Sequence, residues 1–437
     1  MGKNTLSSDQ FLKDLQGKNL NFLIGAGASV GLVNTLDLSL LDESFEDLYS
    51  DKALNQDQRN ALDLIWFRSW IQNTLITKET IAGLSDTNPK GKKVFQNYKR
   101  FINNLGDFLD SEGYDKPKRA NIFTTNYDSL FELTFDEVSQ NQRMIYFNDG
   151  SRGFLNRYIS TENFNLNISH SAMSDNFQRS IPTINLLKIH GSITWDLEEK
   201  SKRIKATLNN DVFKKVQYDS DMIFDHIDLK NFPLIGHLFF GIPLNEDQKE
   251  RNSIREDLIQ ELSKFGNKYK VPSQSPQTDN KACRNADTAL ETPNAKKEVS
   301  LQDFENDYHK LQVVNPTKEK FRETVFQQNY YQLLRMLSFE LEKHDSILIV
   351  FGFSFADEHI LEIIRRSIIN PYLKVYVICY DKASKQIIKN KLGNIGPNKI
   401  NFLPDKYDFV IDGQKKSVKG DFDYLNYLFD GKFGSEE

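Results

Sequence analysis

Four short stretches of the chain carry residues that could hold a phosphate or take part in proton transfer. The first is glycine-rich, runs from Gly25 to Ser29, and follows the apolar residues 20–24. A glycine loop between a buried strand and a helix lets backbone N–H groups face a phosphate, but the same loop also forms ligand-free tight turns. The other stretches are residues 124–128 (Thr-Thr-Asn-Tyr-Asp), 190–192 (His-Gly-Ser) and 352–357 (Gly-Phe-Ser-Phe-Ala-Asp). Together the four favour a ligand site over a plain turn.

The polar residues of these stretches each allow a structural and a chemical role. His190 could be a general base, although a histidine between a strand and a glycine is often a satisfied structural residue. Asn126 could hold a water molecule or a sugar hydroxyl through directed hydrogen bonds, or it could be a turn residue. Asp128 and Asp357 could cap the helices that follow them, and Asp128 could also orient Asn126.

All four stretches follow predicted strands at their carboxyl ends. Strands alternating with helices predict an α/β fold with a doubly wound, mainly parallel sheet of the Rossmann-like type, which binds ligands beyond the carboxyl ends of its strands. The predicted strands lie at residues 20–24, 120–123, 143–147, 184–189, 346–351, 373–380 and 400–403.

The remaining segments predict one domain over residues 1–405 and a C-terminal extension over 406–437. Within the domain, residues 35–118 are expected to be a large helical insertion, because their apolar residues recur at helical spacing. Residues 266–300 are polar and poor in aromatic residues, which predicts a flexible insertion. Further helices are expected over 246–265 and 321–343, and residues 151–180 fit no regular element.

Composition excludes several classes of function. A net charge of −5 gives no support to direct, electrostatic nucleic-acid binding. Cys283 and Cys379 are the only cysteines, so a four-cysteine zinc site is ruled out and a reducing, cytoplasmic setting is favoured. No signal-peptide or membrane-spanning segment is expected. No clustered acidic metal site is visible, which disfavours a metal-dependent nuclease.

In order and approximate spacing, the four stretches resemble the motifs of the sirtuin superfamily. Gly25 to Ser29 is similar to its nicotinamide-dinucleotide loop, and residues 124–128 are similar to its Thr-Gln-Asn-x-Asp motif, with Thr125 in place of glutamine. His190 with its glycine matches the catalytic His-Gly of that family. Gly352 to Ser354 occupies the place of the late Gly-Thr-Ser motif. The resemblance implies a sirtuin-type NAD-binding domain.

Two departures separate the chain from sirtuin deacylases: it lacks the paired cysteines of their zinc module, and residues 31–36 do not read Gly-Ile-Pro-Asp-Phe-Arg. Residues 351–360 and 315–321 resemble instead the bacterial sirtuin-like NAD hydrolases of anti-phage defence. The likeness is greatest to the stand-alone subunit that works with a HerA-type hexameric ATPase. That resemblance implies a homo-oligomer, a HerA-type partner, and NAD⁺ as substrate with no further cofactor and no zinc.

The activity implied by the resemblance is hydrolysis of NAD⁺ to nicotinamide and ADP-ribose. Asn126 would hold the attacking water or the ribose hydroxyls, and His190 would be the general base. The expected NAD-binding residues are Gly25, Ala26, Gly27, Ser29, Thr125, Asp128, Ser192, Gly352, Ser354, Phe355 and Asp357. The alternative is a regulatory scaffold of an ATPase complex that binds NAD⁺ or ADP-ribose without turnover.

Overall fold

The computed structural model describes residues 7–33, 37–38, 43–113, 115–116, 118–140, 144–171, 178–244, 254–269, 299–315, 328–393, 399–411 and 414–433. These residues form two compact units, each made of segments that are not contiguous in sequence. The first contains residues 1–35, 73–209 and 312–437, and the second contains residues 36–72 and 210–311.

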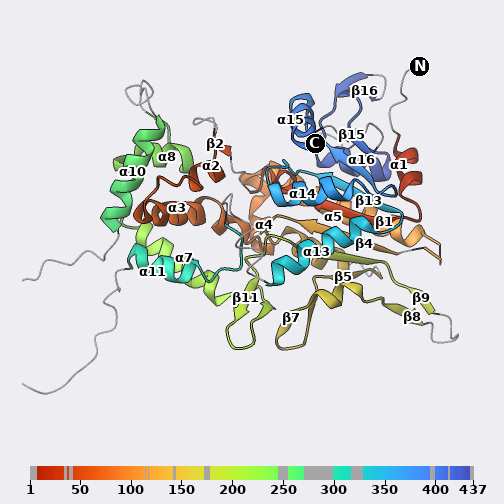
Figure 1. Ribbon diagram of the computed structural model, residues 1–437, viewed down its shortest axis with the longest axis horizontal. Helices are drawn as coiled ribbons and strands as arrows, with labels where there is room; N and C mark the ends of the chain where they lie inside the picture. The colour runs from red at the N-terminus through yellow and green to blue at the C-terminus, as the bar shows by residue number, and fades with distance from the viewer. Residues whose placement is uncertain are drawn as a thin grey trace, which may run out of the picture. The chain divides into compact units, whose positions relative to one another are not determined.

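A seven-stranded sheet is the centre of the first unit (Figure 1), and its strand order is β15-β14-β13-β1-β4-β10-β5. Every neighbouring pair is parallel, which confirms the predicted α/β, doubly wound, parallel sheet. Its strands are β1 (Asn19–Ile24), β4 (Arg119–Thr124), β5 (Tyr146–Asn148), β10 (Thr183–Lys188), β13 (Ser346–Phe351), β14 (Lys374–Ile378) and β15 (Ile400–Leu403).

Helices cover both faces of this sheet because its central strands are buried on both sides. One face packs against α1, α5, α6 and α16, and the other against α13, α14 and α15. The helices of this unit are α1 (Ser8–Leu15), α4 (Lys78–Thr87), α5 (Pro89–Ser111), α6 (Leu130–Ser139), α13 (Gln328–Glu342), α14 (Glu358–Ser367), α15 (Lys382–Leu392) and α16 (Phe422–Asp430).

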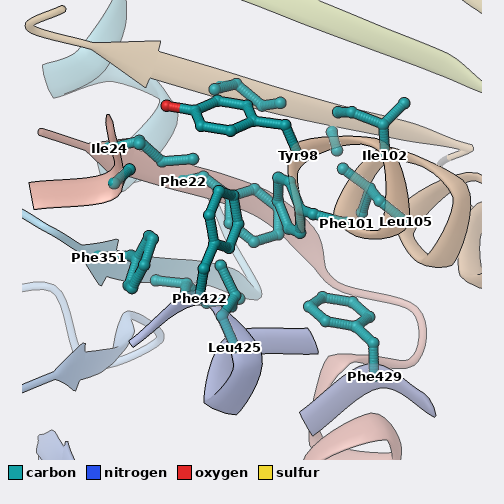
Figure 2. Packing of buried hydrophobic residues seen from close by; sticks show 14 of the residues in the cluster. Phe22, Ile24, Tyr98, Phe101, Ile102, Leu105, Phe351, Phe422, Leu425 and Phe429 are labelled. Carbon is teal, nitrogen blue, oxygen red and sulfur yellow. The ribbon is translucent and has the colours of Figure 1, made fainter. Parts of the chain in front are cut away.

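The core on the α5 and α16 face is rich in aromatic rings (Figure 2). Phe22 of β1 meets Phe101 of α5 edge to face, with ring centroids 5.3 Å apart. Phe422 of α16 lies 5.0 Å from Phe351 of β13 and 4.8 Å from Tyr98 of α5. Such pairs add to the free energy gained by burying apolar surface. Residues 422–430, which the sequence assigns to a C-terminal extension, therefore pack into the core of the first unit.

A polar ladder runs through the opposite face of the same sheet. Asn21, Asn121, Asn185 and Asn148 stand side by side on β1, β4, β10 and β5. The amide of Asn148 donates to Asn185, Asn185 to Asn121, and Asn121 to Asn21, over 2.8 to 2.9 Å. Asn21 donates to Ser346 of β13, which donates to the carbonyl of Glu340. Each side chain in this row donates to the next one toward β13, so each hydrogen bond polarises and strengthens its neighbour.

Small antiparallel sheets complete the first unit. A four-stranded sheet has the order β11-β12-β7-β6, and two hairpins pair β8 with β9 and β16 with β17. Residues 151–180, which fit no element in the sequence, contain four of these strands and the 3₁₀ helix η3 (Thr161–Asn165). The strands are β6 (Ser151–Arg152), β7 (Arg157–Ile159), β8 (Ser169–Ser171), β9 (Gln178–Ser180), β11 (Trp195–Glu198), β12 (Arg203–Ala206), β16 (Asp408–Ile411) and β17 (Gln414–Ser417).

The second unit is mainly helical, with one small strand pair. Its core contains stacked and edge-to-face rings of Phe45, Trp66, Trp70 and Phe239. Its elements are β2 (Asp37–Leu38), β3 (Glu43–Ser44), α2 (Phe45–Tyr49), α3 (Gln56–Ser69), α7 (Asp211–Phe224), η4 (Leu229–Asn231), α8 (Pro233–Phe240), α10 (Ile254–Tyr269) and α11 (Leu301–Tyr308). The 3₁₀ turn η2 (Ile71–Thr74) spans the boundary with the first unit.

The segments predicted from sequence correspond to these elements with some differences. β13 and β15 have the predicted bounds, whereas the third predicted strand, 143–147, is found at Tyr146–Asn148. The block 35–118 is divided: residues 36–72 belong to the second unit, and the rest, including α5, belong to the first. Most of the predicted flexible insertion, residues 270–298, lies outside the described residues, as do residues 321–327 of the helix predicted over 321–343.

Candidate active site

The switch point of the sheet lies between β1 and β13. From β1 the chain first builds the sheet outward through β4 and β10, and it later returns to build the other side through β13, β14 and β15. Ligands of open α/β sheets bind beyond the carboxyl ends of the strands at such a point. The glycine loop leaves β1 there, and residues 352–357 leave β13 beside it.

The glycine loop contacts the loop after β13 through backbone atoms. Gly25 N–H donates to the carbonyl of Phe351 over 3.0 Å, and Gly27 N–H donates to the carbonyl of Gly352 over 2.8 Å. A Cβ on Gly352 would lie 2.5 Å from the nitrogen of Ala28, and the residue has a φ of +63°. These glycines are therefore required for the close approach of the two loops, whatever the loops bind.

The residues after Gly25 form a short 3₁₀ helix, η1 (Ala26–Ser29), and not the start of the α-helix that the sequence suggests. Three of the loop's N–H groups, those of Gly25, Gly27 and Ala28, are already paired with carbonyl groups. A phosphate at this loop would therefore depend on other donors. Lys90 and Lys93, near the N-terminus of α5, are such donors, and both line the cavity beside the loop.

That cavity has a volume of about 820 Å³, within the range of small-molecule sites. Gly27 and Gly352 form part of its wall, and Ser354 lies beside them. Apolar side chains including Val94, Ile378 and Ile387 line another part, and charged groups are supplied by Lys90, Lys93, Lys391, Asp421 and Asp423. The cavity thus combines an apolar surface with three lysines and two aspartates, and two of these charged groups, Lys93 and Asp423, pair with each other over 2.8 Å.

A buried cluster of hydrogen bonds holds Asn126. The hydroxyl of Ser29 donates to Asp128 Oδ2 over 2.9 Å and accepts from the Asn126 amide over 3.2 Å. The hydroxyl of Tyr98 lies 2.9 Å from Ser29 Oγ and is the donor there, since Ser29 has one proton and gives it to the carboxylate. Within the described residues, Asn126 Oδ1 is buried and accepts no hydrogen bond.

Asp128 therefore fills both roles that its position suggested. Its Oδ1 accepts from Leu130 N–H over 3.2 Å at the start of α6, and its Oδ2 fixes Ser29 and, through it, Asn126. Burial raises the pKa of Asp128, and the positive charge of Lys188 opposes that rise. Burial also raises the pKa of Tyr98 well above its usual range, with a further rise from the charge of Asp128, so the phenol stays protonated.

His190 is paired with Asp357, and the contact becomes an ion pair when the imidazole is protonated. Its Nε2 lies 2.9 Å from Asp357 Oδ2, and both side chains are buried. The other oxygen of Asp357 accepts from His359 N–H over 3.0 Å and from Ile360 N–H over 3.2 Å at the start of α14. The helix terminus thereby favours the ionised carboxylate, which orients the imidazole through Nε2. Within the described residues, this contact uses Nε2 and no partner is found for the other ring nitrogen, Nδ1.

The structure places the predicted site residues in three groups. Gly27, Gly352 and Ser354 line the cavity; Ser29, Asn126 and Asp128 form the hydrogen-bonded cluster; His190 and Asp357 form the ion pair. Among the described residues that line the cavity, neither Asn126 nor His190 is present. Gly25 and Ala26 directly precede Gly27 in the same loop, Gly25 as the N-cap and Ala26 as the first residue of η1.

Three further predicted residues have structural surroundings. Thr125 N–H donates to the carbonyl of Ile24 over 3.2 Å. Ser192 is fully buried and accepts from Lys188 Nζ over 3.1 Å. Phe355 is buried, with a φ of +55°, and its ring lies 5.2 Å from that of Phe353. All three lie close to the site in sequence, but the contacts described for them are with the protein.

Two residues of this region were missed in the sequence. Tyr98 reads as one member of an apolar helical stripe, and nothing in its spacing separates it from core residues such as Phe101. Lys188 is buried within β10, where its Nζ bonds Glu132 Oε1 over 2.7 Å and the carbonyl of Asp128 over 2.5 Å. A lysine inside an apolar strand was a visible signal, because a buried lysine requires a partner.

Fold and cluster together define an α/β protein that has a ligand-sized cavity at the switch point of its sheet and a buried Asn–Ser–Asp group beside it. A scan against protein-family models and a search of curated proteins gave no match. No helix in the described parts of the chain is both long and apolar enough to cross a membrane.

Proposed function

We propose that the protein hydrolyses NAD⁺ at the nicotinamide–ribose bond, giving nicotinamide and ADP-ribose. The observation that carries this proposal is the buried Oδ1 of Asn126, which has no hydrogen-bond partner among the described residues. An unsatisfied buried amide oxygen costs free energy, about 1 to 3 kcal/mol, that a bound hydroxyl or water would recover. Ser29 and Asp128 hold the amide in place, so the acceptor is already oriented for such a ligand.

The cavity suits the other half of the dinucleotide. In this proposal the adenosine lies against the apolar wall that contains Ile378 and Ile387, and the diphosphate lies near Lys90 and Lys93. The nicotinamide ribose then extends past the glycine loop toward Asn126. Gly27, which packs closely against Gly352 in the cavity wall, lies only two residues before Ser29. This supports the placement, because one short segment joins the cavity to the residue that holds Asn126.

The chemistry requires little acid catalysis, since nicotinamide leaves as a neutral molecule. The N-glycosidic bond breaks with its electron pair moving to the positively charged pyridinium nitrogen, and the ribose develops oxocarbenium character. Water adds to the anomeric carbon and loses one proton, which His190 accepts as the general base. Asp357 stabilises the imidazolium that forms. Asn126 Oδ1 would accept a hydrogen bond from that water or from a ribose hydroxyl.

The resemblance to sirtuin-like NAD hydrolases supplies the proposed setting. We propose that the chain forms a homo-oligomer, works in the cytoplasm with a HerA-type hexameric ATPase, and depletes NAD⁺ in anti-phage defence by abortive infection. No direct contact with nucleic acid is part of this proposal, because the net charge is −5.

Nicotinamide release from NAD⁺ is the test, measured with the purified chain alone and with its HerA-type ATPase. Wild type should release nicotinamide in at least one state, and Asn126→Ala and His190→Ala should lose about 100-fold or more. Asn97→Ala, at the cavity wall, is a control for folding and binding. Turnover retained by both single variants would refute the assignment of the two residues.

One observation favours a second function, in which the site binds NAD⁺ or ADP-ribose as a regulatory ligand without turnover. The described residues lining the cavity do not include Asn126 or His190, so a ligand could occupy the cavity without reaching either. This alternative predicts saturable binding of ADP-ribose together with no nicotinamide release in any complex. The same assay, run beside calorimetric binding, distinguishes the two functions.

A further inference from the structure

The second unit contains a cluster of metal-ligand side chains that is unrelated to the NAD⁺ proposal. Asp63 lies on α3, and Glu305 and His309 lie at positions i and i+4 along α11 and its C-terminal cap. One potential ligand atom from each of the three lies within 4.8 Å of the others. The i, i+4 spacing places Glu305 and His309 on one face of the helix, toward the same point.

Both carboxylates of the cluster are removed from water. Asp63 and Glu305 are each 2% exposed. Two carboxylates buried together are costly unless a proton or a cation is shared between them.

Glu305 provides the second, independent observation. Its Oε1 is fully buried and accepts no hydrogen bond within the described part of the chain. Its Oε2 lies 3.0 Å from Nε2 of His309. A carboxylate that contributes to a group of potential ligand atoms and still has an unused acceptor is what a cation site requires and what an ordinary buried salt bridge lacks.

The cluster also has an outer layer of support. The hydroxyl of Tyr49 donates to Asp63 Oδ1, and the guanidinium of Arg59 fixes the backbone carbonyls of Tyr49 and Asp51. Hydrogen bonds of this kind orient carboxylate ligands and are a usual part of metal sites. The side chain of His309 is 59% exposed, so one side of the cluster remains open to solvent and gives a cation a path of entry.

We propose that Asp63, Glu305 and His309 bind one divalent transition-metal ion. Two carboxylates and one imidazole suit Zn²⁺ or Mn²⁺, whereas Mg²⁺ prefers oxygen ligands and keeps its water. Such an ion takes ligands at about 2.0 to 2.2 Å, so the three groups need to close by only small side-chain movements. The ion would join α3 to α11, two segments distant in sequence, and would neutralise both buried carboxylates.

Metal binding to the full-length, tag-free chain, after dialysis against a chelator, tests the proposal. Calorimetric titration with Zn²⁺ and with Mn²⁺ should give one saturable site per chain, with Mg²⁺ at least tenfold weaker. Glu305→Gln and His309→Asn should each weaken Zn²⁺ binding at least tenfold. Asp307→Asn, which removes the same charge from the same helix where Asp307 pairs with Lys310, should leave binding unchanged.

A thermal readout separates a lost ligand from a damaged fold. The metal should raise the melting temperature of wild type and Asp307→Asn but not that of Glu305→Gln. Metal-free Glu305→Gln should be at least as stable as wild type, because a repelling buried charge is gone. If Glu305→Gln does not fold, His309→Asn, which changes an exposed side chain, decides the question. Absence of a saturable site in wild type, or equal affinity in all variants, would overturn the proposal.

Discussion

The imidazole Nε2 of His190 and the carboxylate Oδ2 of Asp357 lie 2.9 Å apart, although the two residues follow different strands of the sheet. Asp357 also caps α14 through its other oxygen. One carboxylate therefore positions a histidine and caps a helix at the same time. The two functions can be separated by mutation, because asparagine caps a helix as well as aspartate does.

Asp357→Asn should keep the helix cap and lose the charge that stabilises a protonated His190. If His190 is the general base, nicotinamide release should fall on the order of 100-fold with little change in melting temperature. Asp381→Asn is the matched control, since Asp381 caps α15 through Ser384 N–H over 2.8 Å. Equal activity of the two variants would show that the ion pair has no part in turnover.

Ser29→Ala should remove the central hydroxyl of the buried cluster. Asn126, Asp128 and Tyr98 would each lose a partner, so the free energy of unfolding should fall by about 1 to 3 kcal/mol, and turnover should fall with it. Tyr98→Phe removes one donor and keeps the bonds from Ser29 to Asn126 and Asp128, so its cost should be about 1 kcal/mol. Denaturant unfolding measures both; a smaller loss for Ser29→Ala than for Tyr98→Phe would contradict this account.

Gly352→Ala tests whether the fold needs the close contact between the glycine loop and the loop after β13. Its added Cβ would lie 2.5 Å from the Ala28 nitrogen, in addition to the strain of a φ of +63°. Gly393 has a φ of +75°, and among the described residues no heavy atom lies within 4 Å of the position that its Cβ would take. Gly393→Ala therefore carries the backbone strain alone, about 1 to 3 kcal/mol, because its ψ of −163° lies in a region that essentially only glycine occupies. Thermal unfolding should show a clearly larger loss at Gly352; similar losses would mean that the loops can separate freely.

Cys379 should resist alkylation in the folded protein. The thiol is buried in the core, and burial raises its pKa to about 11. The thiolate is the reactive form, so about one thiol in a thousand is reactive at pH 8, and the rate should rise as the pH increases. Peptide mapping by mass spectrometry after iodoacetamide should show slow labelling of Cys379 in buffer and fast labelling in denaturant. Equal rates in both conditions would contradict the predicted burial effect.

The sheet was predictable because local sequence specifies it. Residues 347–351 form an unbroken apolar run after Ser346, and the structure shows β13 at the predicted bounds, Ser346–Phe351, buried on both faces. The next strand in the sequence, β5, lies at Tyr146–Asn148 and not at the predicted residues 143–147, because residues 141–145 show no clear alternation of apolar and polar side chains. The glycine loop was expected to begin an α-helix and instead forms a four-residue 3₁₀ helix, because its backbone packs against Gly352. No local signal encodes that contact.

The site was less predictable than the sheet, because its geometry depends on pairings between distant residues. The sequence identifies His190 and Asp357 as candidates, but not that they touch. The sequence predicts that Ser29 binds phosphate, whereas in the structure its hydroxyl donates to Asp128 and accepts from Asn126. The cluster of Asp63, Glu305 and His309 was invisible for the same reason, since two separated segments contribute to it.

The hydrogen-bonded asparagines of β1, β4 and β10 fix the register of these strands, and with it the positions at which the site loops leave the sheet. Asn21 and Asn121 each stand three residues before the last residue of their strand, and Asn185 stands three before the end of β10. A slip of one residue would turn an amide to the opposite, aromatic face and break its bonds on both sides. The loops that carry Gly25, Asn126 and His190 are thus aligned by amides buried below them. Loop residues can therefore be substituted to change ligand specificity, while the buried asparagines keep the ends of the three strands in register.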